Sequence, residues 1–400
     1  MMKLDNATFK LTDRGAFGSR ALIVGVIGLA ASAAGYFTDS GQFFHSYLTA
    51  FVFWVSLALG ALFFTMLHHL TGATWSVALR RLSESVMLIL PLMALFFIPI
   101  AFGIRDLFEW SHVDVVAGDH LLQTKEPFLN VTFFLARAAL YFIIWFLLTR
   151  ALYRLSLMQD STGDESLYTR MRQVSAPGMV LFAFTLTFAA FDWLMSLSPH
   201  WYSTIFGVYV FVGSLLAALS FMTLMALYLR GKGVLSDKIT VEHYHDLGKL
   251  LFAFMVFWTY IAFSQYFLIW YGNIPEETFW FHERWRGSWK VITLLIVFGH
   301  FCLPFMALVT RAAKRNLKLM AVVGFWMLFI HWVDLYWIVV PNLGGHGSVQ
   351  PGFHLSWMDL TTMVGIGGVF LWMFWGRFTA RPIVPVNDSK LEASFNFING

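Results

Sequence analysis

Apolar runs of roughly 20 residues recur from one end of the chain to the other, a length that lets an α-helix cross the hydrocarbon core of a bilayer. The runs lack the strict alternation of apolar and polar residues that membrane strands require. Because lipid offers no hydrogen-bond partners, such a run must be helical to pair its backbone groups. The pattern predicts ten spans, at residues 21–37, 46–67, 86–103, 128–149, 176–198, 202–229, 250–271, 289–310, 319–340 and 356–376.

The composition favours the same all-α integral membrane fold. Only 12% of the residues are charged and 58% are hydrophobic, whereas a soluble domain carries roughly 25% charged residues. The single cysteine, Cys302, excludes a thiolate-ligated iron–sulfur cluster and an internal disulfide. The sequence pI is near 9.1, but the basic residues flank the apolar runs, so they indicate membrane topology rather than nucleic-acid binding.

The distribution of Lys and Arg predicts the orientation of the spans. With the N-terminus inside, 21 of the 27 basic residues lie in inner segments, five lie in outer segments, and Arg137 lies within a span. The positive-inside rule therefore places both termini in the cytoplasm, as the even number of spans requires. The predicted parts are a cytoplasmic N-terminus at 1–20, a membrane domain at 21–380 and a cytoplasmic tail at 381–400, which is polar and expected to be unpacked.

Three outer connections are long enough to have structure of their own. The segments 104–127 and 272–287 are aromatic and of mixed charge, so we expect surface helices or docking loops there. The third, 341–355, is rich in glycine and has no charged residue apart from histidine.

Short motifs recur in the same order in two sets of four consecutive spans. The matching pairs are Tyr47-x-Thr49 with Tyr202-x-Thr204, Thr149-Arg150 with Thr310-Arg311, and Asp192 seven residues before Pro199 with Asp334 seven residues before Pro341. This order predicts two parallel four-helix bundles, at 46–198 and 202–340, with the first and last spans outside them. The alternative is chance similarity among apolar helices of low diversity.

Ionisable side chains within the spans are the candidate functional residues, because a charge in hydrocarbon is costly unless a bundle or cavity shelters it. They are Arg137, Asp192, His300, His331, Asp334, Asp359 and Glu84. Imidazole titrates near neutral pH, and burial shifts a carboxyl group toward that range, so His300, His331 and Asp334 suit proton transfer. We expect Arg137 to lie near Asp192 and His300 near Asp334.

Structural roles are the alternative for each of these residues. Arg137 and Asp192 can form an ion pair that only holds two helices together, and a buried histidine can simply bond a carbonyl or hydroxyl group. Glu84 can be a solvated charge at a helix end, and His68 and His69 are expected to be interfacial. A haem held by two histidines would need His300 and His331 to face each other. No catalytic nucleophile, metal site or phosphate loop is predicted.

Several longer motifs resemble a known family. They are Phe191-Asp192-Trp193-Leu194-Met195-Ser196-Leu197-Ser198-Pro199-His200-Trp201-Tyr202-Ser203-Thr204, Phe263-Ser264-Gln265-Tyr266-Phe267-Leu268-Ile269-Trp270-Tyr271-Gly272-Asn273-Ile274-Pro275-Glu276-Glu277, His300-Phe301-Cys302-Leu303-Pro304-Phe305 and Val333-Asp334-Leu335-Tyr336-Trp337. The sequence is similar over nearly its whole length to the NrfD/polysulfide-reductase-type membrane subunits of bacterial alternative complex III. Its length is closer to the second, ActF-type subunit than to the longer first one.

The resemblance implies a subunit of a quinol:cytochrome c oxidoreductase in the bacterial cytoplasmic membrane. The implied partners are c-type cytochromes, an iron–sulfur protein, a homologous first membrane subunit and small helical anchors. Haem c and iron–sulfur clusters would reside in those partners, and no cofactor is expected to be bound in this chain. A contact between this chain and menaquinone or ubiquinone is left open. The family likeness implies proton-path roles for Asp192, His300 and Asp334. The alternatives are a proton-coupled secondary transporter and a purely structural membrane anchor.

Overall fold

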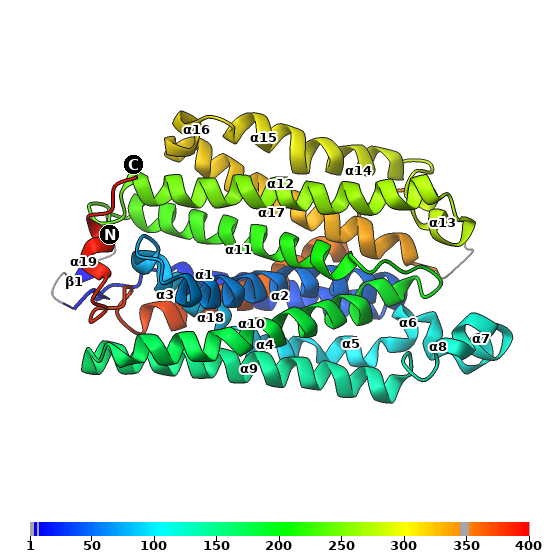
Figure 1. Ribbon diagram of the computed structural model, residues 1–400. Helices are drawn as coiled ribbons and strands as arrows, with labels where there is room; N and C mark the ends of the chain where they lie inside the picture. The colour runs from blue at the N-terminus through cyan, green and yellow to red at the C-terminus, as the bar shows by residue number, and fades with distance from the viewer. Residues whose placement is uncertain (1–3, 6–7, 345–351, 400) are drawn as a thin grey trace.

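The protein is a bundle of long helices (Figure 1). The computed structural model describes residues 4–5, 8–344 and 352–399. Within these residues, ten helical segments are long and apolar enough to cross a membrane. The predicted all-α membrane fold with ten spans is therefore confirmed.

The helices and strands have the following bounds. The first five spans are α1 (Phe17–Tyr36), α2 (Ser40–Thr71), a third span broken into α3 (Val77–Met87), α4 (Leu90–Phe96) and α5 (Ile98–Phe102), α9 (Val131–Thr162) and α10 (Ser166–Trp193). The last five are α11 (Phe206–Gly231), α12 (Val241–Gly272), an eighth span made of α14 (Trp289–Ile296), the π-helix η3 (Val297–Cys302) and α15 (Leu303–Leu308), α17 (Leu317–Val339) and α18 (Trp357–Thr379). The short elements are β1 (Leu4–Asp5), β2 (Lys10–Leu11), α6 (Ile104–Leu107), η1 (Glu109–Ser111), α7 (Val113–Gly118), α8 (His120–Lys125), η2 (Met195–Leu197), α13 (Pro275–Glu283), α16 (Arg311–Arg315), η4 (Val340–Asn342) and α19 (Leu391–Phe395).

Several helices begin well outside the predicted apolar runs. The predicted start at 250 lies inside α12, which begins at Val241, and the predicted start at 176 lies inside α10, which continues through Pro177. Hydropathy detects the part of a helix that lies in hydrocarbon, whereas the helix itself ends where its backbone bonds are capped. Gly72 and Gly163, with φ of 62° and 66°, end α2 and α9 in the left-handed conformation that glycine adopts without steric cost.

Two long helices, α2 and α11, pack against each other at the centre of the molecule. α3, α4 and α10 pack against α2, and α9 packs on the outside against α10 and α4. α12 and α17 pack against α11, and the eighth span packs on the outside against α12 and α17, while α1 and α18 pack together against α2. Both termini lie at one end of the bundle, which we call the terminal end, and α6–α8 and α13 lie at the opposite end (Figure 1). Short helices therefore occupy both long connections, 104–127 and 272–287. Part of the Gly-rich connection, 345–351, lies outside the described residues.

The tail after 381 is packed, so the expectation that it is unpacked was wrong. Ile383, Val384 and Leu391 are buried, and the Ile383 amide donates to the Phe9 carbonyl at 3.0 Å. Asp388 is only 5% exposed. The polar composition of the tail did not indicate this packing. Only a few apolar side chains hold the tail, together with Asp388, whose partner Arg80 lies far away in the sequence.

The contact between α1 and α18 depends on glycine. A Cβ at Gly28 would lie 2.7 Å from the Gly365 backbone nitrogen, and one at Gly25 would lie 2.7 Å from the Val369 nitrogen. Small residues let membrane helices approach closely and gain van der Waals contact. The backbone-to-backbone contact leaves no room for a side chain at either position.

We therefore expect Gly28→Leu to separate α1 from α18 and to lower the free energy of unfolding by about 1–3 kcal/mol, as overpacking usually does. Thermal unfolding in detergent measures the loss. Gly376→Leu in α18 is the matched control, because a Cβ at Gly376 meets no atom within 4 Å. Equal stability of the two variants would contradict the close contact.

Candidate functional site

All seven candidate residues are sheltered from lipid. Their exposed fractions are 0% for Glu84, Asp192 and His300, 2% for Asp334 and Asp359, 3% for His331 and 7% for Arg137. They do not form one site. They fall into four groups in different parts of the bundle, so each group has its own chemistry.

The first group is the predicted pair of Arg137 on α9 and Asp192 on α10. Arg137 Nε and Nη2 donate to the two Asp192 oxygens at 2.9 and 2.7 Å, and Tyr141 donates its hydroxyl to the same carboxylate at 2.7 Å. The guanidinium also donates to the Phe128 carbonyl at 2.9 Å and lies 3.8 Å from the centre of the Phe128 ring. A fully bonded, two-pronged ion pair of this kind suits a structural link between two helices.

Removing the cation should therefore be costly. Arg137→Gln leaves the buried Asp192 carboxylate without its charge partner, and we expect a loss of about 3–5 kcal/mol in the free energy of unfolding. Chemical or thermal unfolding in detergent measures this loss. The double variant Arg137→Gln/Asp192→Asn should be more stable than the single variant, and strictly additive losses would contradict the assignment of a structural pair.

The second group, which we call the central cluster, consists of Ser56, Tyr209, Trp258, His300, His331 and Asp334. Tyr209, in the first turn of α11, donates its hydroxyl to Asp334 on α17. One turn away on α17, His331 Nε2 bonds to the Ser56 hydroxyl of α2 at 2.9 Å. The cluster therefore joins both central helices to α17 in the interior of the bundle.

His300 completes the central cluster from the eighth span. Its ring stacks on the indole of Trp258 with centroids 3.6 Å apart and planes 10° apart. A Cβ at Gly213 would lie 3.2 Å from the His331 ring and 3.8 Å from Trp258 Nε1, so the glycine admits both rings to the same place. Among the described residues, both His300 nitrogens, His331 Nδ1 and Trp258 Nε1 are buried without a hydrogen-bond partner.

The predicted pairing of His300 with Asp334 was wrong, because Asp334 bonds to Tyr209 and His300 stacks on Trp258. Tyrosine was overlooked because its ring counts as apolar in the pattern that located the spans. Asp192 is not a member of the central cluster. It lies on α10, which packs against α2. Within the described residues, no hydrogen bond joins Asp192 to His300 or Asp334, since Asp192 is bonded to Arg137 and Tyr141.

His300 lies in the π-helix η3 within the eighth span. Pro304 has no N–H, so it cannot donate to the His300 carbonyl in an α-helix or to the Gly299 carbonyl in a π-helix. Trp326 on α17 donates its indole N–H to the Gly299 carbonyl at 2.7 Å and satisfies it. Pro304 is therefore the sequence signal for a local change of helix type beside a buried histidine.

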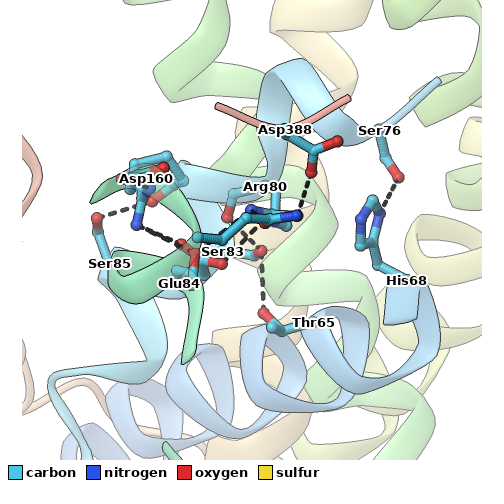
Figure 2. Close-up of polar contacts among 12 residues, drawn as sticks. Thr65, His68, Ser76, Arg80, Ser83, Glu84, Ser85, Asp160 and Asp388 are labelled. Atoms are coloured by element: carbon cyan, nitrogen blue, oxygen red, sulfur yellow. Dashed lines mark hydrogen bonds and ion pairs between the residues drawn. The ribbon is translucent and has the colours of Figure 1, made fainter. Parts of the chain in front are cut away.

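The third group is a network of charges at the terminal end, formed by Arg80, Arg81, Glu84, Asp160 and Asp388. All of them except Arg81 are labelled in Figure 2. Arg80 Nη1 lies 2.6 Å from Asp388 and its Nε lies 3.1 Å from Glu84. Arg81 lies 2.8 Å from Glu84 and 2.5 Å from Asp160. We call this set the terminal network. It contains two cations and three carboxylates from α3, α9 and the tail.

The terminal network overturns the expectation for Glu84. Glu84 is not a solvated helix-end charge, because it is fully buried between the two arginines. His68 and His69, in the last turn of α2, are each 3% exposed, and His68 Nδ1 bonds to the Ser76 hydroxyl at 2.7 Å. Asp160 and Asp388 were missed because both lie outside the predicted spans.

Asp359 forms the fourth group, near the opposite end. It accepts a hydrogen bond from the Ser46 hydroxyl at 2.5 Å and caps α18 by accepting from the Ser356 amide at 2.8 Å. Gln42 links Ser46 to His354, with contacts of 2.9 and 3.3 Å. This short polar chain leads from α18 to His354, near the end of the Gly-rich connection.

Arg284 is a buried cation that sequence reasoning placed in an outer loop. It is 1% exposed, stacks 3.5 Å over the Trp280 ring and donates to the carbonyls of Trp280, Trp337 and Ile338 at 3.0, 3.0 and 2.9 Å. Burial lowers the pKa of Arg284 to about 9, which leaves it cationic at neutral pH. Its positive charge lies against the last carbonyls of α17, the helix that carries Asp334.

A titratable contact also lies outside the spans. Asp119 accepts from His200 Nε2 at 2.5 Å and caps α8 by accepting from the Leu121 and Leu122 amides. The hydrogen bond from His200 is the largest cause that holds the pKa of Asp119 below its ordinary value. A lowered carboxyl pKa stabilises the fold above the unfolded value near 3.9, and this stabilisation is lost as the pH falls through the folded value.

We therefore expect the start of α8 to loosen in acid. Hydrogen exchange of the Leu121 and Leu122 amides should lose protection as the pH falls below about 4, the region of the unfolded Asp pKa. Asp119→Asn serves as the reference at each pH. If the wild type and this variant keep the same relative protection throughout, the Asp119–His200 contact does not stabilise the loop.

No protein-family model matches this chain, and neither does the sequence of any curated protein. The family assignment thus stays a prediction that rests on the motifs quoted above. Within the described residues, no group of three or more His, Cys, Asp or Glu side chains has the arrangement of a metal site.

Proposed function

We propose that this chain is a membrane subunit of a quinol-oxidising respiratory complex, similar to the second NrfD/polysulfide-reductase-type subunit of alternative complex III. In this proposal it is part of an oxidoreductase rather than an enzyme by itself, and it provides a proton path rather than a redox centre. The observation that carries the proposal is the central cluster. It places a carboxyl group and two imidazoles in the lipid-sheltered interior, on helices that contain the family-like motifs.

The chemistry of the central cluster supports proton transfer. Asp334, Tyr209 and the two histidines each have an atom that can accept or release a proton, and the unpartnered imidazole nitrogens leave positions where water could bond. Quinol oxidation releases protons, so a subunit with titratable groups inside the membrane suits such a complex. Asp192 is assigned a structural role here, because its oxygens are held by Arg137 and Tyr141.

In this proposal the terminal network and the central cluster belong to one proton path, with the terminal network nearer the terminal end of the bundle and the central cluster deeper in the membrane. Thr65 of α2 donates to Ser83 of α3 at 3.0 Å, next to Glu84, and Ser56 of the central cluster lies on the same helix nearer its middle. Thr65 lies nine positions after Ser56, a separation of about 13 Å along the helix, so water would have to bridge this distance. Glu84 is in this proposal the entry point from the terminal end.

The proposed location is the bacterial cytoplasmic membrane, with both termini in the cytoplasm. The excess of Lys and Arg in the segments at the terminal end supports this orientation. The proposed partners are c-type cytochromes, an iron–sulfur protein, a homologous first membrane subunit and small helical anchors. A contact with menaquinone or ubiquinone stays a prediction without assigned residues.

Co-purification tests the proposed complex. An affinity-tagged chain, extracted from its native membrane in mild detergent, should bring c-type cytochromes that are visible in optical spectra and an iron–sulfur protein detectable by iron analysis. A chain that leaves the membrane alone, with no haem absorbance and no iron, in several detergents would overturn the proposal.

A proton-coupled secondary transporter is the second candidate, and one observation favours it. Transporters often bind ions where a membrane helix departs from regular geometry, and the eighth span is π-helical beside His300. Reconstituted alone in vesicles, a transporter would move a solute in response to a pH gradient. A redox subunit would not do so without its partners.

A further inference from the structure

A groove of about 490 Å³ opens on the surface at the terminal end, between the third span, α9 and the end of α18. The α9 wall is one continuous stripe of side chains, because its residues recur at intervals of three and four from Phe146 to Ser161. The groove is separate from the central cluster, so its interpretation does not depend on the proposed function.

Three arginines line this groove, namely Arg150, Arg154 and Arg377. All three side chains are exposed, and none of them has an ion-pair partner among the described residues. No acidic residue lines the groove. The carboxylate of Asp160 is already bound to Arg81, whose guanidinium lies 5.8 Å from the centre of the Tyr153 ring. The groove is therefore an uncompensated concentration of positive charge.

The depth of these arginines matches that of lipid headgroups. Arg150 lies about 29 Å along α9 from Val131, and Arg377 lies about 30 Å along α18 from Trp357, at 1.5 Å per residue. The hydrocarbon core of a bilayer is about 30 Å thick. Both guanidinium groups thus lie where the hydrocarbon ends, in the leaflet at the terminal end.

The part of the groove nearer the membrane centre is apolar. Leu88, Pro91 and Phe146 line it there, and Phe146 is one turn deeper than Arg150. A charged rim above an apolar floor matches an amphiphile that has an anionic head. The planar fork of arginine binds phosphate oxygens in pairs, which a lysine cannot do.

We propose that this groove is a binding site for an anionic phospholipid, with its phosphate held by Arg150, Arg154 and Arg377 and an acyl chain against Leu88, Pro91 and Phe146. An isoprenoid quinone could lie on the same apolar floor, but it is uncharged and would leave three arginines unpaired. Basic pockets between membrane helices are recognised sites for anionic headgroups. The arginines would then serve a specific lipid in addition to setting the topology.

Lipid retention by the full-length chain, purified with whatever subunits accompany it, tests this proposal. The protein is delipidated in neutral detergent and incubated with phosphatidylglycerol or with phosphatidylcholine that has the same acyl chains, and retained lipid is counted by native mass spectrometry. We expect the wild type to prefer phosphatidylglycerol by at least about tenfold, or about 1.4 kcal/mol. Arg150→Gln/Arg154→Gln/Arg377→Gln should reduce the preference to about twofold or less.

Two control variants separate the groove from general charge and from folding. Arg170→Gln/Arg172→Gln/Lys318→Gln removes the same charge from exposed positions at the same end and should keep the preference. Arg150→Lys/Arg154→Lys/Arg377→Lys keeps the charge without the fork and should retain part of the preference. Thermal unfolding identifies any variant that is misfolded. If the glutamine variant of the groove is misfolded, the lysine variant tests the proposal in its place, and we expect it to prefer phosphatidylglycerol less strongly than the wild type does.

Competition identifies the source of the ligand. Glycerol phosphate, which has the head without acyl chains, and ubiquinone should both fail to displace phosphatidylglycerol. Displacement by either one at matched concentration would overturn the proposal, as would equal loss of preference in the groove variant and in the charge-matched control. A wild-type protein that retains both lipids equally would also overturn it.

Discussion

Replacing Arg80 by glutamine is expected to cost the protein about 3–5 kcal/mol of its free energy of unfolding, the usual penalty for breaking a buried ion pair from one side. Arg80 is fully buried and lies against Glu84 and Asp388, while Gln159 accepts from its Nη2 at 3.0 Å. Without it, the terminal network holds three carboxylates and a single arginine. Thermal unfolding in detergent gives the size of the loss.

Charge balance predicts a different result for Asp388. Removing this carboxylate leaves two arginines with two carboxylates, so Asp388→Asn should cost less than Arg80→Gln, although it weakens the contacts to Arg80 and Tyr168. The double variant should recover part of the loss of Arg80→Gln. If Asp388→Asn proves the more damaging single change, the charge account of the terminal network is wrong.

The same variants should release the tail. In the wild type, Lys390 donates to the Gly72 carbonyl at 2.7 Å, and Leu391 is buried. Trypsin should therefore cleave after Lys390 much faster in Asp388→Asn than in the wild type. This readout reports the tail itself, separately from the stability of the bundle.

Replacing Asp334 by asparagine is the change with the largest expected effect on function. Asparagine keeps the size and can still bond to Tyr209, but it cannot take up or release a proton. If Asp334 carries protons, we expect quinol-driven proton release to fall by about tenfold or more, the scale on which a positioned proton-transfer group usually acts. The complex should still assemble, because the fold near Asp334 is kept.

Two further variants control for structure. Tyr209→Phe removes the hydroxyl that donates to Asp334 but keeps the carboxyl group, so it should have a smaller effect on proton release. His300→Ala removes a ring that stacks on Trp258 and should reduce proton release without preventing assembly. A structural anchor would show no change in either variant beyond altered assembly.

The ten spans could be predicted from sequence because hydropathy responds directly to the thickness of the bilayer. The helix ends could not, since the polar turns of α10 and α12 continue the helix beyond hydrocarbon. The bond between Arg137 and Asp192 was expected because both side chains are charged and lie on consecutive spans. Partners such as Tyr209 and Asp388 were not, because a tyrosine is hidden in an apolar helix and Asp388 lies in a polar tail.

Helix rotation explains the wrong pair. A sequence shows how deep His300 and Asp334 lie, but it does not show which way each helix is turned about its axis. The structure turns His300 toward Trp258 of α12 and Asp334 toward Tyr209 of α11. The central cluster therefore contains the predicted residues with partners that only the packing could reveal.

The most direct test of the account is the number of protons released per electron in vesicles that contain the purified complex. We expect Asp334→Asn to lower this ratio and Tyr209→Phe largely to preserve it, with both complexes fully assembled. An assembled Asp334→Asn complex that oxidises quinol and releases protons as the wild type does would contradict the account.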